Sequence, residues 1–413
     1  MIRLSTSTSP PRHFKPDPFP YHHELTLEIN ALSHQGKGIG RYKDWVVMVA
    51  YAVPGDRIKA RIFRNHSNYS EADLIAVLES SPDRVAPRCE LFGECGGCQY
   101  QHIDYGVQLK WKQQHVRESL ERLAGLKCEV SAVRTSGRAY AYRSKLTPHF
   151  RQSPKRHPDT AVGFEHSQSR RIVDVPYCPI ATDALNEVLP KAREELRNGQ
   201  LPFKKGGTLL LRDCIEGVVS DPNAIVSSRI GEWVFQFQAG EFFQNNPFIL
   251  ADLVDYVVQQ AADEGLKTLI DAYCGVGVFS LAASRHFDHC FGIEINANAI
   301  HWANANAVIN KVDNCTFRLG KAESIFEGLV CNGHEASLII DPPRRGCDEA
   351  FLQQVFAFSP QKVVYVSCAP DTQARDLAHF LAKGYEASSV QPFDLFPQTR
   401  HIENVVVLQR KGF

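Results

Sequence analysis

From residue 241 onward, short apolar runs alternate with amphipathic stretches, and this alternation limits the possible folds more than any other feature of the chain. Such runs are typical of buried strands, and the stretches between them have apolar residues at helical spacing. Strands alternating with helices over this distance predict a doubly wound, mostly parallel α/β sheet. The expected strands span residues 268–271, 290–294, 338–341, 363–367 and 405–408, and the expected helices span 276–286, 297–310, 348–357 and 371–382.

A glycine-rich segment follows the first of these strands. Gly275 and Gly277 let the backbone turn sharply and bring free N–H groups at a helix start close to a ligand. Glu294 ends the next strand, where an acid accepts hydrogen bonds from ribose hydroxyls. The longer glycine pattern of dinucleotide sites is absent, so the segment predicts a nucleoside ligand such as S-adenosylmethionine. A packing turn without a ligand is the alternative interpretation.

Three further polar segments adjoin predicted strands, at the sheet edge where parallel α/β sheets bind ligands. Asp341 opens the sequence Asp-Pro-Pro-Arg-Arg-Gly, Cys368 follows another strand, and Glu403 precedes the last one. A Cys in such a crevice is a candidate nucleophile and a Glu a candidate general base, although a lone Cys is more often structural. Amino-methyltransferases need an aromatic residue where this chain has Arg344, so methylation of an amino group is disfavoured.

Four cysteines are candidate metal ligands. Cys89, Cys95 and Cys98 lie within ten residues, and Cys178 lies further along the chain. The sequence has neither a signal-peptide core before residue 23 nor an apolar run long enough to span a bilayer, so we expect a cytoplasmic protein that binds no membrane. In a reducing compartment such a cluster indicates metal rather than disulfides, and four thiolates suit a [4Fe–4S] cluster or a structural Zn²⁺.

The rest of the sequence predicts further domains and a polyanionic partner. We expect a disordered tail over residues 1–23, an OB-like β-barrel over 24–82, a β-rich central domain over 83–240 and the α/β domain over 241–413. The net charge is zero, but residues 110–157 hold 12 Lys and Arg against 3 Asp and Glu. Within that segment, basic residues alternate with Tyr140, Tyr142 and Phe150, a pattern that fits single-stranded RNA. A solvated strand face over core aromatic residues is the alternative.

Five motifs together resemble the RNA uracil-5-methyltransferases that use S-adenosylmethionine. They occur in the family's order and are Phe243-Gln244-Asn245-Asn246, Asp271-x-Tyr273-Cys274-Gly275-x-Gly277, Asp341-Pro342-Pro343-Arg344-x-Gly346, Ser367-Cys368-x-Pro370 and His401-Ile402-Glu403-Asn404. The barrel resembles the TRAM domain of many members, so the resemblance covers residues 24–413. It implies a class I, Rossmann-like methyltransferase domain.

The resemblance also implies a role for each matching residue. Cys368 matches the nucleophile that adds to C6 of uracil, and Glu403 matches the base that removes the C5 proton. The matching cofactor-binding positions are Gln244, Tyr273, Gly275, Glu294 and Asp341, and the residues that match the family's four-Cys iron–sulfur site are Cys89, Cys95, Cys98 and Cys178. A Cys nucleophile needs a lowered pKa, which we expect Arg344 or the helix start after Pro370 to supply.

The implied activity is methyl transfer to C5 of a uridine in structured RNA. Members with both the barrel and the four-Cys site resemble the ribosomal-RNA enzymes, so 23S rRNA is the first expected substrate, with tRNA as the alternative. We expect a monomer. A non-catalytic iron–sulfur RNA-binding protein is the hypothesis from another class, and Val278 and Lys321, which depart from the family's pattern, favour it.

Overall fold

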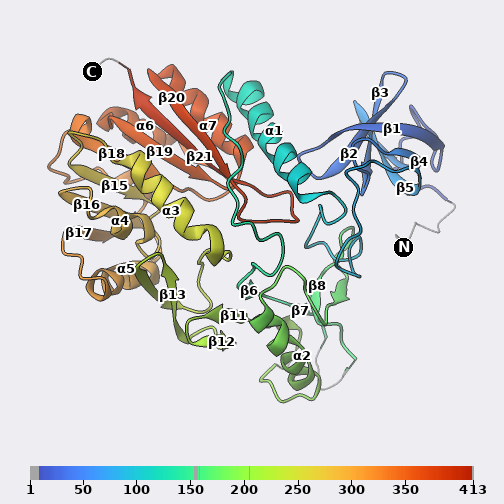
Figure 1. Ribbon diagram of the computed structural model, residues 1–413, viewed down its shortest axis with the longest axis horizontal. Helices are drawn as coiled ribbons and strands as arrows, with labels where there is room; N and C mark the ends of the chain where they lie inside the picture. The colour runs from blue at the N-terminus through green and yellow to red at the C-terminus, as the bar shows by residue number, and fades with distance from the viewer. Residues whose placement is uncertain (1–8, 153–156, 158, 204, 412–413) are drawn as a thin grey trace.

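The structure is a computed structural model that describes residues 9–152, 157, 159–203 and 205–411. A seven-stranded sheet forms the C-terminal part of the chain (Figure 1). The strand order is β17-β16-β15-β18-β19-β21-β20, with parallel pairing from β17 to β19 and antiparallel pairing of β21 with both neighbours. The strands are β15 (Thr268–Ala272), β16 (His289–Glu294), β17 (Cys315–Leu319), β18 (Ala336–Ile340), β19 (Lys362–Ser367), β20 (Tyr385–Phe393) and β21 (Glu403–Arg410).

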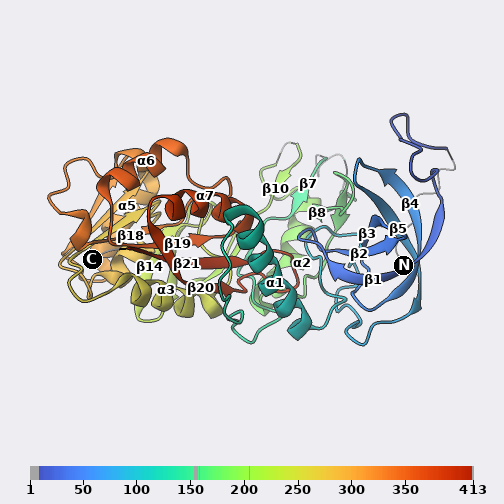
Figure 2. The same ribbon diagram turned by 90° about the horizontal axis from the view of Figure 1, so that it is seen from above.

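Helices cover both faces of this sheet, as the strand–helix alternation predicts. One apolar core lies under α3 (Pro247–Ala261), α4 (Val278–Ala283) and α5 (Ala297–Ile309). The core on the opposite face lies under α6 (Glu349–Phe358), α7 (Pro370–Ala382) and α1 (Tyr105–Ala124), which comes from far earlier in the chain. The predicted α/β fold is confirmed, and α1 unexpectedly belongs to its outer layer, packed against α7 (Figures 1 and 2).

The predicted N-terminal barrel is also confirmed. Five strands close in the order β1-β2-β3-β5-β4, with alternate residues of β1 such as Leu25 and Leu27 inside. The strands are β1 (Glu24–Leu32), β2 (Lys37–Tyr42), β3 (Trp45–Ala50), β4 (Arg57–Asn65) and β5 (Tyr69–Glu79).

Part of the stretch predicted as a disordered tail contacts the barrel. Phe19 is buried in the barrel core, where its ring contacts His23 and Tyr42. The Asn65 amide donates hydrogen bonds of 2.7 Å to the carbonyls of Lys15 and Phe19. An aromatic anchor among prolines thus orders a stretch that composition alone marks as loose, and residues 1–8 lie outside the described part.

Small sheets and one helix follow the barrel and α1 along the chain, and in Figure 1 the part around the helix forms a lobe below the barrel and the large sheet. Helix α2 (Asp183–Arg197) packs on the sheet that contains β11. The short strands are β6 (Lys145–Leu146), β7 (His149–Phe150), β8 (Gly163–Glu165), β9 (Ile172–Asp174), β10 (Gly207–Thr208), β11 (Leu211–Cys214), β12 (Gly217–Val219), β13 (Ile225–Ile230) and β14 (Trp233–Gln238). The exact domain boundaries stay predictions.

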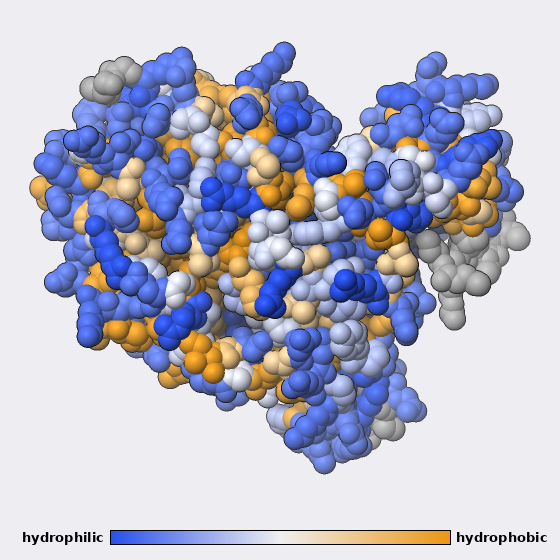
Figure 3. All heavy atoms as spheres, in the orientation of Figure 1, coloured by the Kyte–Doolittle hydropathy of each residue, from blue (hydrophilic) through white to orange (hydrophobic). Residues whose placement is uncertain are grey.

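The surface in view is largely hydrophilic, with scattered apolar patches (Figure 3). Within the described residues, no helix combines the length and the apolar character that a membrane crossing requires.

Candidate active site

The predicted site residues gather along one edge of the large sheet. Parallel strands β15, β16, β18 and β19 all end at this edge, and β21 runs the opposite way, so it begins there. Ser367 of β19 pairs with Asn404 of β21, which places Cys368 and Glu403 next to each other, one residue beyond that pair. The topology therefore brings together a thiol and a carboxyl group that are 35 positions apart in the sequence.

Glu403 is buried and its carboxyl group is hard to ionise. Its side chain is almost inaccessible, at 2% exposure for the residue. Burial raises the pKa of Glu403 well above its usual value, the negative charge of Asp341 raises it further, and the nearby Arg344 cation partly offsets both. A carboxylate whose pKa is raised is a stronger base, so Glu403 suits a general base once its carboxyl group has been ionised.

The expectation of a lowered Cys368 pKa is wrong for the protein without substrate. Burial raises the pKa of the Cys368 thiol to about 11, and the charge of Glu403 adds to the rise. Arg344 does contact the thiol and lowers its pKa, as expected, but the desolvation is larger. In the protein without substrate, the thiol is therefore protonated at neutral pH.

A cavity of about 240 Å³ opens beside Cys368. Its lining includes Arg344, Arg400 and His401 from the α/β domain and Lys112 from α1. Burial lowers the pKa of His401 to about 4, and the surrounding cations, Arg344 first, lower it further. The imidazole is thus neutral, with Nδ1 3.2 Å from a nitrogen of Arg344. This positive pocket suits an enolate oxygen or an RNA phosphate.

The glycine-rich segment lies at the end of β15 and is held in a strained turn. Tyr273, Gly275 and Gly277 all have positive φ, of 67°, 54° and 87°. A Cβ on Gly277 would lie 2.9 Å from the Phe317 ring, so only glycine fits there. Glu294 accepts a hydrogen bond of 3.3 Å from the Gly275 N–H, so the predicted ribose-binding acid meets the glycine turn.

Buried polar atoms without partners mark the same edge. Asp271 accepts two hydrogen bonds from Ser280 through Oδ2, while its Oδ1 has no partner among the described residues. Asn245 Oδ1 is likewise buried and unpartnered. Burial raises the pKa of Asp271 to about 7, and burial together with the charge of Asp271 raises that of Asp341 to about 7. The orphaned acceptor of Asp271, at the end of the strand that leads into the glycine turn, fits a polar ligand of nucleoside type.

Comparison with known proteins identifies the family. The model of the tRNA (Uracil-5-)-methyltransferase family matches residues 225–411, and that of the TRAM domain matches residues 23–75. A tRNA (uracil(54)-C(5))-methyltransferase of Schizosaccharomyces pombe is 37% identical over 95% of this chain and 79% of its own length. The chain belongs to the RNA uracil-5-methyltransferase family. With that family comes S-adenosylmethionine as methyl donor, as the resemblance implied.

Other relatives of this RNA uracil-5-methyltransferase extend the match. The Saccharomyces cerevisiae tRNA (uracil(54)-C(5))-methyltransferase is 32% identical over 94% of this chain and 72% of its own length. An uncharacterized RNA methyltransferase of Halalkalibacterium halodurans is 33% identical, covering 94% and 97% of the two chains. The Pyrococcus abyssi tRNA (uracil-54, C5)-methyltransferase, solved with S-adenosyl-L-homocysteine, has the same fold, with a TM-score of 0.72, 23% identity and coverage of 93% and 100%.

The four predicted metal ligands of the methyltransferase lie near one another. The charges of Cys89, Cys95 and Cys178 each raise the pKa of Cys98 to some extent, although burial contributes most to its value of about 12. Within the described part of the chain, no three Cys, His, Asp or Glu side chains have the arrangement of a metal site. Four thiols thus fit the chemistry of a four-thiolate site. Among the described residues, however, their sulfur atoms are not arranged as ligands around one metal ion.

The predicted RNA-binding residues only partly face solvent. Tyr142 and Phe150 are buried in the core, so for these two the structural alternative is correct. Arg134 pairs with Asp252 at 2.8 Å. The barrel cations pair with acids as well: Lys37 with Glu71, Lys59 with Glu24, Arg61 with Asp73 and Arg64 with Glu71. Lys155 and Arg156 lie outside the described residues.

Sequence reasoning missed four residues around the pocket: His34, Lys112, Asp394 and Arg400. One signal was available, because Gln108 and Lys112 lie four residues apart and would share one face of a helix. A charge on a buried face needs a partner. The partner, Asp394, lies 282 positions away and shows no local pattern.

Proposed function

We propose that this enzyme methylates C5 of a uridine in tRNA, with Cys368 as nucleophile and Glu403 as base. The observation that carries the proposal is the pairing of β19 with β21, which sets the thiol and the carboxyl group side by side next to Arg344. The glycine turn and Asp341 lie along the same sheet edge and are the proposed cofactor site, with Gln244, Tyr273 and Glu294.

The first step is addition to the ring. Cys368 loses its proton to water, its sulfur forms a bond to C6, and the C5–C6 electron pair moves through C4 onto O4 as an enolate. The Arg344 side chain contacts the thiol and lowers its pKa, so it offsets part of the energetic cost of burying the thiolate. Arg344 and Arg400 at the pocket stabilise the enolate oxygen.

The second step is substitution at C5. Bound S-adenosylmethionine would supply an electrophilic methyl group. The enolate O4 becomes a carbonyl again, the electron pair returns through C4 to C5 and forms the bond to the methyl carbon, and S-adenosylhomocysteine leaves with the electron pair of the broken S–CH₃ bond. Glu403 then removes the C5 proton, the electron pair of that C–H bond restores the C5–C6 double bond, and the sulfur of Cys368 leaves. The raised pKa of Glu403 favours its protonated form, which is the product of this proton transfer.

The names of the relatives support tRNA rather than 23S rRNA as substrate. Two of them, at 37% and 32% identity, are tRNA (uracil(54)-C(5))-methyltransferases, so uridine 54 is the proposed target. The 23S rRNA expectation rests on the combination of a barrel with four cysteines, and it stays the alternative that the substrate test separates.

Glu403→Gln tests the proposed roles. This variant should form the Cys368–C6 bond and accept the methyl group, but retain the RNA because the C5 proton cannot leave. Incubation with S-adenosylmethionine and tRNA should give a denaturation-resistant protein–RNA adduct, which Cys368→Ala should not form. Glu386→Gln, at an exposed acid on β20, is the matched control and should release product normally. Release of product by Glu403→Gln at the normal rate would rule out its role as base.

We propose that Cys89, Cys95, Cys98 and Cys178 hold a structural [4Fe–4S] cluster. It would join the 89–98 segment to the start of the α2 region and take no part in methyl transfer. The mutual effect of the four thiols on their pKa values supports the grouping. Purification without oxygen should give a brown protein containing iron and sulfide, whereas a colourless protein with one equivalent of zinc would contradict the assignment.

A further inference from the structure

One loop carries the pocket residues and the proposed base. It connects β20 to β21, spans residues 394–402 and leads directly into Glu403. Arg400, His401 and Ile402 from this loop line the cavity beside Cys368. Its geometry therefore determines where the pocket cations and the Glu403 carboxyl group lie relative to the reacting carbon.

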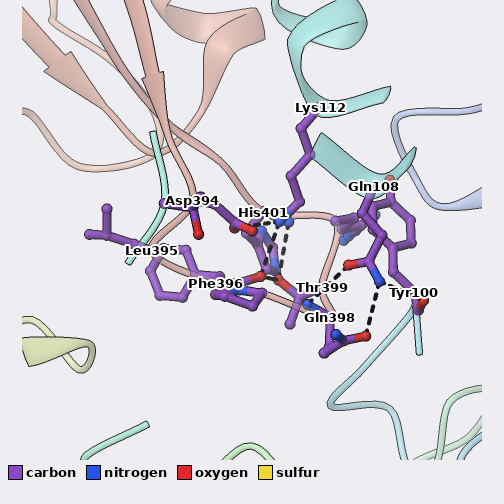
Figure 4. Close-up of polar contacts among 12 residues, drawn as sticks. Tyr100, Gln108, Lys112, Asp394, Leu395, Phe396, Gln398, Thr399 and His401 are labelled. Carbon is purple, nitrogen blue, oxygen red and sulfur yellow. Dashed lines mark hydrogen bonds and ion pairs between the residues drawn. The ribbon is translucent and has the colours of Figure 1, made fainter. Parts of the chain in front are cut away.

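A buried ion pair fixes the start of this loop to helix α1 (Figure 4). Lys112 Nζ lies 2.6 Å from Asp394 Oδ1, and both side chains are completely buried. The same ammonium group donates a hydrogen bond of 3.1 Å to the carbonyl of Phe396. The other carboxylate oxygen of Asp394 accepts a hydrogen bond from Tyr105, also on α1. A buried ion pair adds little to net stability. Its main effect here is therefore on the position of the loop.

The tip of the loop is held in the same way. Gln108 of α1 exchanges two hydrogen bonds with Gln398, of 3.0 and 3.3 Å (Figure 4). The backbone N–H groups of Gln99 and Tyr100 both donate to the Gln398 carbonyl, at 3.1 and 3.0 Å. Gln398 has φ of 66°, a strained conformation for a residue other than glycine, which persists only where surrounding contacts enforce it.

We propose that Lys112 and Asp394 are a positioning pair, which holds the 394–402 loop so that Arg400, His401 and Glu403 face Cys368. The inference rests on the proposed function, because it gives these loop residues a task in uridine methylation. Neither Lys112 nor Asp394 is proposed to touch the reacting atoms. Their effect on the rate arises through the loop, whose strained backbone depends on contacts made by α1.

The double variant Lys112→Met with Asp394→Asn is the informative one. Each single variant leaves one buried group unpaired and should lower the thermal midpoint strongly. The double variant removes both charges, so it should regain much of the midpoint, but it also loses the ammonium contacts to the loop. We expect its kcat to stay about 10²-fold below wild type, with KM for RNA changed less than kcat, since a misplacement of about 1 Å has a cost of this size.

Two controls separate positioning from general damage. Lys110→Met makes the same change at an exposed position two residues away on α1 and should leave kcat unchanged. Backbone hydrogen exchange should be faster at residues 396–402 of the double variant and unchanged in β18 and β19. If kcat recovers together with the midpoint, or if kcat falls while exchange in the loop is unchanged, the inference is wrong. If wild type itself makes no 5-methyluridine, the proposed function fails. Even then, unchanged hydrogen exchange in the loop of the double variant would refute the positioning role of Lys112 and Asp394.

Discussion

Alkylation of Cys368 by iodoacetamide tests the electrostatics of the reaction pocket most simply. With a pKa of about 11, roughly 10⁻³ of the thiol is ionised at pH 8, against about a quarter for an unperturbed cysteine. The rate constant at pH 8 should therefore be a few hundredfold below that of an exposed cysteine. It should rise about tenfold per pH unit from pH 7 to pH 10, because only the thiolate reacts.

The assay follows the Cys368 peptide by mass spectrometry after timed alkylation, which separates it from the other cysteines. Arg344→Met removes the cation that lowers the Cys368 pKa, so its rate at pH 8 should fall by about tenfold or more, whereas Arg344→Lys keeps a positive charge. Glu403→Gln should leave the rate unchanged or raise it, because the Glu403 carboxyl group opposes the thiolate only to the extent that it is ionised. A plateau below pH 9, or an Arg344→Met rate equal to wild type, would refute the reasoning.

Three further predictions concern stability and the cofactor site. Gly277→Ala should lower the free energy of unfolding by about 1–3 kcal/mol and weaken S-adenosylmethionine binding in calorimetry, because its φ is 87° and a Cβ would meet Phe317. Asp271 has a folded pKa of about 7, above its usual value, so its contribution to stability is full at low pH and is lost as the pH rises through 7. The wild-type thermal midpoint should thus fall between pH 5 and pH 8, and Asp271→Asn should reduce that fall; an equal fall in both proteins would contradict this. Phe19→Ala should destabilise the barrel by about 3–5 kcal/mol in thermal unfolding, and no change would mean that residues 9–23 do not pack as described.

The sequence predicts the central strands of the large sheet well and its edges poorly. Strands β15, β16, β18 and β19 are apolar on both faces, so their bounds agree with the prediction within two residues. Strand β17 lies at the sheet edge and buries only Phe317, and β20 mixes polar and apolar residues, so neither gives a clear apolar run. Helix α1 lies far before the strand–helix alternation, and its place against α7 depends on contacts distant in sequence.

The residues of the site also fall into two groups, those that a sequence motif identifies and those that it does not. Residues in motifs, such as Cys368 and Glu403, were found because their types and neighbours carry the pattern. Arg400 and Asp394 have no such context, and only the pairing of β20, β21 and α1 brings them to the pocket. The sign of the Cys368 pKa shift was missed because a sequence shows the nearby cation but not the burial that outweighs it.

The central claim is methyl transfer to C5 of uridine, and nucleoside analysis tests it directly. The wild-type chain is incubated with labelled S-adenosylmethionine and with tRNA or 23S rRNA transcripts, offered separately. Each RNA is then digested and its methylated nucleosides are identified by mass spectrometry. The account predicts labelled 5-methyluridine from tRNA, at position 54. Absence of 5-methyluridine from both RNAs, or a methyl group on any other nucleoside, would contradict it.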